Sequence, residues 1–303
     1  MGQTNAFESD IIMAPSLTKT VILSVITMTA FALNSVFGRL ALVSDAIDPA
    51  SYTTIRLTSG AMMLFVLVAL RGGFKKDLSP PSFLSGTGVS AVALFVYAAF
   101  FSFAYITLDT GVGALILFAC VQATMIGWGL FKGERPSIQA WIGIVLAIGG
   151  FVYLVSPGLK APDPLGAVLM AIAGIAWGVY SLKGKGLSDP LRATARNFIW
   201  SVPLGLVLVS IFLSQQKLEY HGVVLAVASG AVTSALGYVL WYVTLKGLTA
   251  NKAAILQLTV PVIATFFGIA LLGEPLTQRF IIATICILGG VALSILAKEK
   301  KRG

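Results

Sequence analysis

Charged side chains are scarce in this 303-residue chain: Asp, Glu, Lys and Arg make up 11% of it, whereas apolar residues make up 57%. Soluble domains usually carry about 25% charged and about 45–50% apolar residues. So few charges could not cover the surface of a soluble protein of this length. We therefore expect a protein whose outer surface faces the hydrocarbon of a bilayer.

Cysteine and histidine are almost absent. Cys120 and Cys286 lie in apolar runs without the spacing of a redox or metal motif, and we expect them to pack as small apolar side chains. The single histidine, His221, has no ligand set around it. No intramembrane cluster of His, Asp and Glu and no nucleophile beside a base is visible. We therefore predict no catalytic residue, no metal, no cofactor and no enzymatic activity.

Carboxylates are absent from the middle of every apolar run, because all the Asp and Glu residues lie in tails, loops or run ends. Intramembrane carboxylates are the usual proton relays and partners of cationic substrates. Their absence disfavours proton-coupled export of cationic drugs and favours a facilitator. Coupling through another group is left open.

Long apolar runs fill the chain instead. Broken at glycine, proline and charge clusters, they give ten candidate helices, each long enough to cross about 30 Å of hydrocarbon. Barrel strands would alternate with period two, and these runs do not. We predict an all-α integral membrane protein. The expected spans are 19–42, 50–70, 83–105, 110–131, 137–156, 164–183, 191–213, 221–245, 251–272 and 276–297.

Basic residues are concentrated on one side of the predicted membrane. The loops on the side of the two termini hold most of the Lys and Arg, and the alternate loops hold only Lys160, Lys217 and Arg279. This bias predicts cytoplasmic termini, with residues 1–18 and 298–303 as cytoplasmic tails. The orientation of the protein in the membrane explains the net charge of +9, so we expect no nucleic-acid partner.

Two stretches carry the same pattern. A Gly-Glu pair with a nearby proline occurs at Glu134 and again at Glu274, and a Gly-Gly pair follows each. Five predicted spans, an odd number, separate them, so the second copy is inserted the other way up. The sequence therefore predicts two inverted five-helix repeats, 19–156 and 157–297, an arrangement that builds alternating access around a site near the midplane.

The repeated residues have expected structural roles. Glu134 and Glu274 should cap or lock the turn before the last helix of each repeat, where a carboxylate meets the favourable end of a helix dipole. The Gly-Gly pairs 149–150 and 289–290, together with Gly143, should let helices approach closely.

Ten spans in an inverted repeat, with Gly-Glu-x-Pro or Gly-Glu-Pro before the last helix of each half and Gly-Gly within it, resemble the EamA family of the drug/metabolite transporter superfamily. The resemblance covers about residues 20–297. Within the family, the chain is most similar to the YddG-type amino-acid exporters. The resemblance implies cytoplasmic termini and export of small metabolites. The small multidrug transporters of this superfamily use a first-span glutamate, which is missing here.

Polar and aromatic side chains inside the spans are the candidates for a substrate cavity, since amides and phenols in hydrocarbon need partners or water. Interhelical bonding is the alternative for the amides, and an interfacial belt is the alternative for Trp and Tyr. Tyr105 is assigned to that belt. The predicted cavity residues are Asn34, Phe37, Tyr97, Phe101, Gln122, Trp177, Tyr180, Ser181, Tyr238, Trp241 and Gln257.

Three further residues are candidates for gating. Pro261 should kink the ninth span, as a hinge or only as a packing bend. Arg39 and Arg56 are placed at the outer ends of the first two spans, near Asp45 and Asp48. Salt bridging or snorkelling is the simple interpretation. An outer gate, or an attractor for a substrate carboxylate, is the alternative.

These features predict a secondary transporter or facilitator that exports small metabolites, with amino acids, including aromatic ones, as the first choice. A cavity of aromatic and amide groups without fixed charge suits a zwitterion. A multidrug or nucleotide-sugar carrier is the main alternative, and phosphorylated substrates would require basic residues facing mid-membrane. A channel or scramblase would need a continuous polar stripe. The expected partners are a small substrate and lipid; a monomer is compatible with the sequence, which does not fix the oligomeric state.

Overall fold

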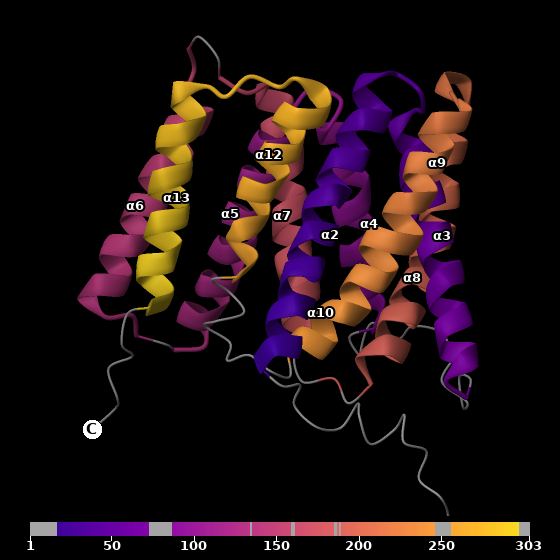
Figure 1. The fold of residues 1–303 in the computed structure, drawn as a ribbon, viewed down its shortest axis with the longest axis horizontal. Helices are drawn as coiled ribbons and strands as arrows, with labels where there is room; N and C mark the ends of the chain where they lie inside the picture. Colours follow the sequence, from indigo (N-terminus) through magenta and orange to yellow (C-terminus); the bar gives the residue numbers. More distant parts are fainter. Residues whose placement is uncertain are drawn as a thin grey trace, which may run out of the picture.

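The structure is a computed structural model that describes residues 17–72, 87–133, 135–158, 161–184, 187, 189–245 and 256–296. Its helices lie side by side and alternate in direction (Figure 1). The first described helix begins, and the last one ends, on the same side of the molecule, at the bottom of Figure 1. We call this side the terminal face and the other side the opposite face.

Helices account for all the long elements of the described chain. The first half contains α2 (Leu17–Val43), α3 (Pro49–Leu70), α4 (Thr87–Ala104), α5 (Thr110–Phe131) and α6 (Ile138–Val155). The second half contains α7 (Pro164–Gly184), α8 (Pro190–Ile211), the short turn η1 (Leu213–Gln215), a continuous rod of α9 (Tyr220–Ala228), η2 (Ser229–Leu236) and α10 (Gly237–Leu245), then α12 (Thr259–Leu272) and α13 (Gln278–Leu296).

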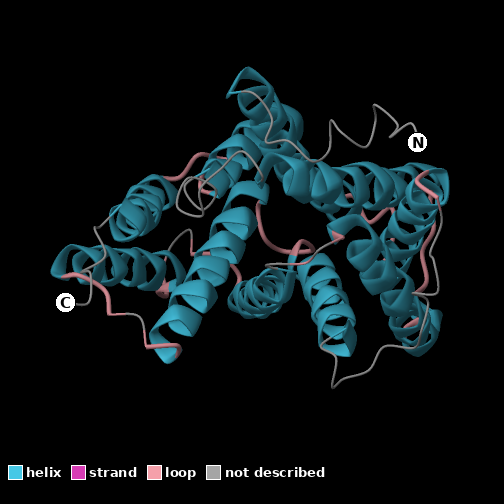
Figure 2. Cartoon of the chain, turned by 90° about the horizontal axis from the view of Figure 1, so that it is seen from below, coloured by secondary structure: helices cyan, strands magenta, loops and turns pink. Residues whose placement is uncertain are grey.

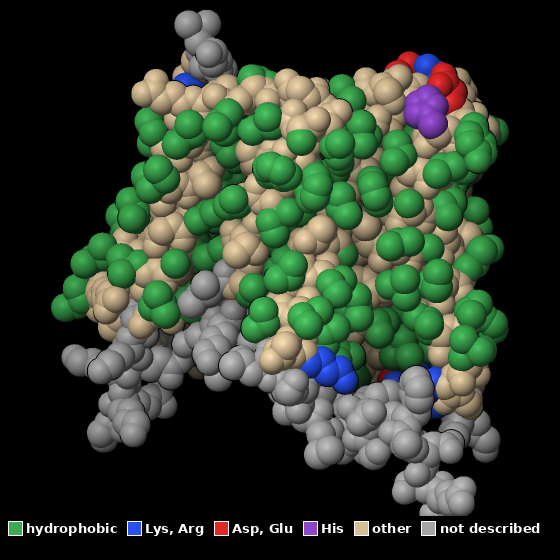
Figure 3. Space-filling view, viewed as in Figure 1, with side chains coloured by type: hydrophobic (Ala, Val, Ile, Leu, Met, Phe, Trp, Pro, Cys, Tyr) green, Lys and Arg blue, Asp and Glu red, His purple; other side chains and the backbone are tan. Residues whose placement is uncertain are grey.

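The prediction of ten apolar helices is confirmed. Eight of the described helices are long and apolar enough to cross a membrane, the rod counting as one, and α4 and α12 are shorter apolar helices. Figure 3 shows apolar side chains over the middle of one face of the molecule, with charged ones only near its upper and lower edges. The chain is an integral membrane protein.

The packing of the helices repeats when the two halves are exchanged. In the first half, α4 and α5 pack on α7; in the second, the rod and α12 pack on α2. Likewise α4 packs on α8, and η2 on α3. The remaining counterparts pair with each other: α3 with α8, α5 with α12, and α6 with α13. Because each helix and its counterpart are five positions apart in a chain of alternating helices, with four helices between them, the two halves run in opposite directions, as predicted.

Local signals set the helix ends. Asp48 caps α3 by accepting a hydrogen bond from the Ser51 N–H (2.8 Å), with Pro49 in the first turn. The glycine of each Gly-Glu pair follows a helix with positive φ: Gly133 after α5 (88°) and Gly273 after α12 (65°). Glycine adopts this left-handed conformation without strain, so the repeated motif ends the fourth helix of each half.

The last helices of the two halves, α6 and α13, pack through glycine. A Cβ on Gly290 would lie 2.5 Å from the Gly143 carbonyl oxygen, and one on Gly150 would lie 2.6 Å from the Cβ of Cys286. Gly149 and Gly289 instead face open space. Close approach therefore explains three of the five glycines, and the same expectation for the other two is wrong.

The ninth span is interrupted next to Pro261, where a kink was expected. The chain is helical at Leu256 and Gln257, turns at Leu258, and starts α12 at Thr259. Pro261 lies in the first turn of α12, three residues after the turn at Leu258. Because proline has no N–H to donate to the residue four positions earlier and its ring crowds that carbonyl, the break falls immediately before it.

Seen along the helices from the terminal face, the helices are distributed around the middle of the molecule (Figure 2). Side chains from several of them converge there.

Candidate functional site

Aromatic side chains meet between the two halves. The Trp177 ring of α7 lies 4.8 Å from the Tyr97 ring of α4 and 4.9 Å from the Tyr238 ring of α10, measured between centroids. These rings belong to a small cavity that we call the central cage. Its lining residues are Phe31, Asn34, Ser35, Tyr97, Phe101, Leu117, Phe118, Trp177, Thr233 and Tyr238.

Asn34 of α2 connects the cage across the halves. Its amide nitrogen donates to the Tyr97 hydroxyl (3.2 Å), and its amide oxygen accepts from the hydroxyls of Ser229 (2.6 Å) and Thr233 (3.1 Å). Asn34 thus lines the cavity and also bonds to other helices, so the two interpretations of this amide, cavity lining and interhelical bonding, do not exclude each other. Its two acceptor contacts fall on η2, a π-helical segment, and such segments occur often at functional sites.

Arg56 of α3 lies beside the cage. Its side chain donates from Nη2 to the Tyr97 hydroxyl (2.9 Å) and from Nε to the Ser234 hydroxyl (3.2 Å). The guanidinium carbon lies 5.0 Å from the centroid of the Tyr97 ring and 4.7 Å from that of Phe101. Arg56 is only 1% exposed, and no carboxylate among the described residues forms an ion pair with it.

The central cage is closed. Its volume is about 20 Å³, which is close to the space that one water molecule needs. A metabolite does not fit without displacement of the rings.

A polar cluster covers the cage toward the opposite face. The Arg39 side chain, at the end of α2, donates to the backbone carbonyls of Tyr105 (3.0 Å) and Ile106 (2.8 Å) in the α4–α5 turn. Arg39 also lies 3.6 Å from Asp109 and 3.5 Å from Glu274. We call Arg39, Asp109, Thr110 and Glu274 the gate cluster. The Tyr105 ring, whose backbone carbonyl accepts from Arg39, packs edge-on against Phe101 of the cage, so cluster and cage are connected through these rings.

Glu274 joins two helices of different halves. Its carboxylate accepts hydrogen bonds from the Thr110 N–H (2.8 and 2.9 Å) and the Thr110 hydroxyl (2.9 Å), at the first residue of α5. The carboxylate therefore caps α5, whereas Thr277 caps α13 by accepting from the Phe280 N–H (3.1 Å). We expected Glu274 to cap or lock the turn before α13. Its carboxylate instead caps α5, a helix of the other half. Glu134 lies outside the described residues.

Burial raises the pKa of Glu274 above its usual value, and the neighbouring Asp109 adds to that shift, while Thr110 and Arg39 oppose it. Glu274 lies in the connection between α12 and α13, outside the membrane-spanning helices.

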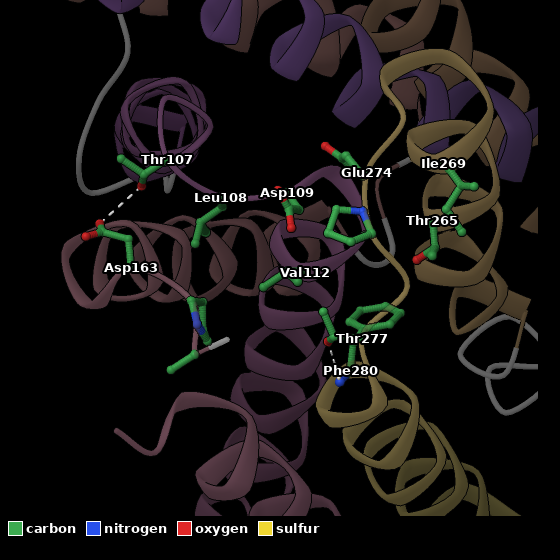
Figure 4. Close-up of a pocket in the computed structure, with 14 residues that line it drawn as sticks. Thr107, Leu108, Asp109, Val112, Asp163, Thr265, Ile269, Glu274, Thr277 and Phe280 are labelled. Carbon is green, nitrogen blue, oxygen red and sulfur yellow. Dashed lines mark hydrogen bonds between the residues drawn. The ribbon is translucent and has the colours of Figure 1, made fainter. Parts of the chain in front are cut away.

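A recess of about 270 Å³ opens beside the gate cluster (Figure 4). It lies between the α4–α5 turn, the connection before α7, and the adjoining ends of α12 and α13. Across it, the Thr107 hydroxyl donates to Asp163 (3.1 Å), whose carboxylate also accepts from the Gly166 N–H (2.7 Å) and so caps α7. The recess brings carboxylates of both halves to the opposite face.

The structure places five of the predicted cavity residues in the cage: Asn34, Tyr97, Phe101, Trp177 and Tyr238. Tyr180 stacks on Trp177 (5.3 Å) and Trp241 packs edge-on against Phe31 (6.0 Å), so both stand directly behind the lining.

The remaining four predicted cavity residues are also absent from the lining. Phe37 is half-buried elsewhere on α2, and the Ser181 hydroxyl donates to the Trp177 carbonyl of its own helix (2.8 Å). Gln257 is buried just before the turn at Leu258. Gln122 is buried one turn beyond Phe118, and its amide nitrogen has no hydrogen-bond partner in the described chain.

Two placements near the membrane surface are corrected. Arg56 lies near neither Asp45 nor the outer end of its helix: it is the eighth residue of α3 and fully buried, so the cavity region does hold a fixed charge. Tyr105 is not in an interfacial belt, because it is fully buried and its hydroxyl donates to the Thr110 carbonyl (3.2 Å). Arg39 does lie near a helix end, paired with Asp109 and not with Asp48.

Several site residues were missed in the sequence. Phe31, Leu117 and Phe118 look like ordinary apolar residues, and no sequence signal separates them from lipid-facing ones. The small polar residues of η2 had a signal. The stretch SGAVTSAL places Ser229, Thr233 and Ser234 inside an apolar span, and hydroxyls in such a place commonly bond to other helices.

Comparison with known proteins identifies the family. The profile of the EamA-like transporter family matches residues 18–156 and again 164–296, nearly the whole chain in two copies. The chain belongs to the EamA-like transporter family. The EamA expectation is confirmed, and with it the prediction of a membrane transporter in place of an enzyme.

Two relatives of this EamA-like protein are named as uncharacterized. An uncharacterized protein of Pseudomonas aeruginosa is 47% identical over 275 residues, which cover 91% of this chain and 94% of the relative. The uncharacterized inner membrane transporter YedA of Escherichia coli K12 is 24% identical over 262 residues, 82% of each chain. A crystal structure with a TM-score of 0.63 and 19% identity covers 90% of this chain and 96% of its own, and shows the same fold.

Proposed function

We propose that this transporter exports amino acids, aromatic ones included, by alternating access, in the manner of the YddG-type exporters. The observation that carries the proposal is the closed central cage between two inverted halves. The rings of Tyr97, Trp177 and Tyr238 offer apolar faces for a side chain, and electron-rich faces of this kind also attract an ammonium group. Asn34 and Thr233 supply polar groups at the same place.

The orientation belongs to the same proposal. The terminal face is cytoplasmic in this scheme, because the connections on that side carry most of the basic residues. A relative named as an inner membrane transporter supports placement in the inner, cytoplasmic membrane. The opposite face, with the gate cluster and the recess, then faces outward.

The moving parts follow from the contacts. Residues 19–156 and 157–297 form the two repeats, and the gate cluster holds them together at the outer face. Arg39 ties α2 to the α4–α5 turn, and Glu274 ties α5 to the α12–α13 connection. The break at Leu258, just before Pro261, is the place where α12 can change direction. In this scheme the gate cluster opens for release while the cage expands.

A facilitator fits the distribution of carboxylates. Every carboxylate in the described chain lies in a connection or at a helix end, so no proton relay crosses the described spans. Glu274 is the residue through which a proton could still act. A phosphorylated or nucleotide-linked substrate is favoured by one observation, the buried cation Arg56, and is therefore included in the test.

The test is uptake into liposomes that contain the purified protein. Saturable uptake of labelled phenylalanine, leucine and other amino acids is expected, with no accumulation above equilibrium when a pH gradient is imposed. Accumulation driven by the gradient would reject the facilitator. Transport of cationic dyes or nucleotide sugars, with no amino acid taken up, would reject the substrate while leaving the family and the fold untouched.

A further inference from the structure

We propose that Arg56 binds the carboxylate of the transported molecule, so that the substrate class is a monoanionic carboxylate on an aromatic or other apolar body. The inference rests on the proposed function for one point, the placement of the substrate in the central cage. It goes further because it assigns the recognition of the substrate carboxylate to one residue and defines which molecules can be transported.

The charge of Arg56 requires a partner. A guanidinium does not lose its proton in a protein, so Arg56 is a cation wherever it lies. A cation held in a low-dielectric interior is costly without a counter-charge, and intramembrane ionisable residues commonly mark substrate paths. Arg56 is 1% exposed, and the described carboxylates all lie in connections or at helix ends, none of them in an ion pair with it. The protein provides the cation, and the missing anion is assigned to the substrate.

The hydrogen bonds of Arg56 leave room for that anion. Nε donates to Ser234 and Nη2 to Tyr97, whereas Nη1 has no hydrogen-bond partner in the described chain. A guanidinium presents its donors in a planar fork that matches the two oxygens of a carboxylate. The unpartnered Nη1 and a Nη2 released by Tyr97 together form such a fork.

The position of Arg56 connects this fork to the cage. The two rings on which the guanidinium stacks, Tyr97 and Phe101, are themselves cage residues. Rotation of Tyr97 away from Arg56 would therefore both enlarge the cage and free Nη2. Asn34, the other donor to the Tyr97 hydroxyl, would be released by the same movement. Binding of a carboxylate and opening of the cage are thus coupled through one tyrosine.

The chemistry of the site limits the substrate. One guanidinium balances one negative charge, which favours a carboxylate over a phosphate dianion. No carboxylate of the described chain lines the cage, so an α-ammonium finds only aromatic faces and the oxygens of Asn34, Ser35 and Thr233. The amino group should therefore be dispensable, whereas the carboxylate should be required. A 2-oxo acid with the same body should be carried, and the decarboxylated amine should not.

The experiment uses the full chain in liposomes with four probes of one shape: phenylalanine, phenylpyruvate, phenylalanine amide and phenethylamine. We expect saturable uptake of the two acids and none of the two probes without a carboxylate. Arg56→Gln should weaken the apparent affinity for both acids about ten- to a hundredfold, and Arg56→Lys should fall between. Arg71→Gln is the matched control, since Arg71 pairs with Asp189 at the terminal face and should behave as the unmodified protein.

The outcomes separate this inference from the proposed function. Uptake of phenylpyruvate without uptake of amino acids would reject amino-acid export and uphold the role of Arg56. Equal uptake of acid and amine, or an unchanged affinity in Arg56→Gln, would overturn the role of Arg56 while amino-acid export could stand. Preference for a phosphorylated probe, or no uptake of any carboxylate, would also overturn it. If Arg56→Gln does not fold, uptake of the four probes by the unmodified protein decides whether a carboxylate is required.

Discussion

The Tyr97 hydroxyl occupies an unusual position for a single atom. It accepts hydrogen bonds from Arg56 of α3 and from Asn34 of α2, and Asn34 in turn accepts from hydroxyls of η2. The phenol, which belongs to α4, therefore links α2, α3 and η2, and so both halves of the protein. In a dry interior each such bond matters, because a donor left without an acceptor bears its full desolvation cost.

Replacement of this hydroxyl tests the linkage. Tyr97→Phe keeps the ring and leaves the Arg56 and Asn34 donors without their shared acceptor, so we expect the free energy of unfolding to fall by about 1–3 kcal/mol. The measurement is the thermal or denaturant midpoint of the detergent-solubilised protein. Tyr153→Phe is the control, because Tyr153 is 42% exposed on α6 and the same change there should have little effect. Equal midpoints for the two variants would contradict the linkage.

The sequence predicts which residue types belong to the site better than it predicts how they face. Tyr97, Trp177 and Tyr238 stand out because a phenol or indole within an apolar span needs an explanation. Phe31 and Phe37 lie three residues on either side of Asn34, so helical periodicity does not choose between them. The sequence places Arg56 at a helix end because only a few residues separate it from a loop. Its actual partners, Tyr97 and Ser234, belong to helices far away in the chain, so the sequence does not reveal them.

At the scale of elements, the contact between α6 and α13 depends on which glycine of each pair faces the other helix. Gly143 and Gly290 face each other, whereas the adjacent Gly289 faces open space. In a membrane, helices associate through such close contacts because lipid is as apolar as the side chains. This contact unites the last helix of each half.

The neighbouring glycines provide a matched pair of substitutions. Gly290→Ala would force its Cβ against the Gly143 carbonyl oxygen (2.5 Å) and the Ala147 nitrogen (2.6 Å), so we expect a loss of about 1–3 kcal/mol in the free energy of unfolding. Gly289→Ala should be neutral or stabilise by up to about 1 kcal/mol, since alanine favours the helix. Thermal midpoints in detergent measure both. The reverse order would show that α6 and α13 do not pack through Gly290.

Elements follow from local signals where those signals exist. Apart from the starts of the third and ninth spans, whose predicted first residues (83 and 251) lie outside the described residues, the span limits lie within a few residues of the predicted ones. Apolar length, caps such as Asp48 and the terminating Gly133 and Gly273 act locally. The turn at Leu258 has such a signal in Pro261, whereas the π-helical η2 has none. Gly230 of η2 lies against the α3 backbone at Arg56, so the shape of η2 is set by tertiary packing.

At the scale of the whole molecule, the inverted duplication was readable because the Gly-Glu pattern recurs after an odd number of spans. What the pattern does not reveal is that Glu274 caps a helix of the facing half. That contact makes the gate cluster a candidate two-state element, closed here and open in the outward state. Any difference in the environment of Glu274 between these states makes the equilibrium depend on pH.

The sign of that dependence follows from burial. The pKa of Glu274 is raised in this closed arrangement, whereas an open, hydrated cluster would return it toward its usual value. The closed state therefore holds the proton more tightly. Acid should favour closure, and closure should weaken as the pH rises through the raised pKa. Glu274→Gln imitates the protonated form, while Glu274→Ala removes the acceptor for Thr110 and should favour opening at every pH.

Labelling of a cage cysteine measures the open fraction. Ser35→Cys, in a background with Cys120→Ala and Cys286→Ala, places a thiol in the central cage. A membrane-impermeant thiol reagent added outside intact cells reaches it only through the gate cluster if the termini are cytoplasmic. Because the thiolate fraction itself rises with pH, the informative quantity is the labelling rate with Glu274 divided by the rate in the Glu274→Gln variant at the same pH.

We expect this ratio to exceed one at neutral pH and to approach one in acid, because Glu274 and its neutral substitute become equivalent once the carboxylate is protonated. Arg39 and Asp109, the charged groups that face Glu274, are present in both proteins and cancel in the ratio. Glu219→Gln gives the control, since Glu219 lies half-exposed beside Lys217 on the same face and should leave the ratio constant across the pH range. A constant ratio for Glu274→Gln, or one that falls below one at neutral pH, would show that this carboxylate does not couple the proton to the opening of the outer face.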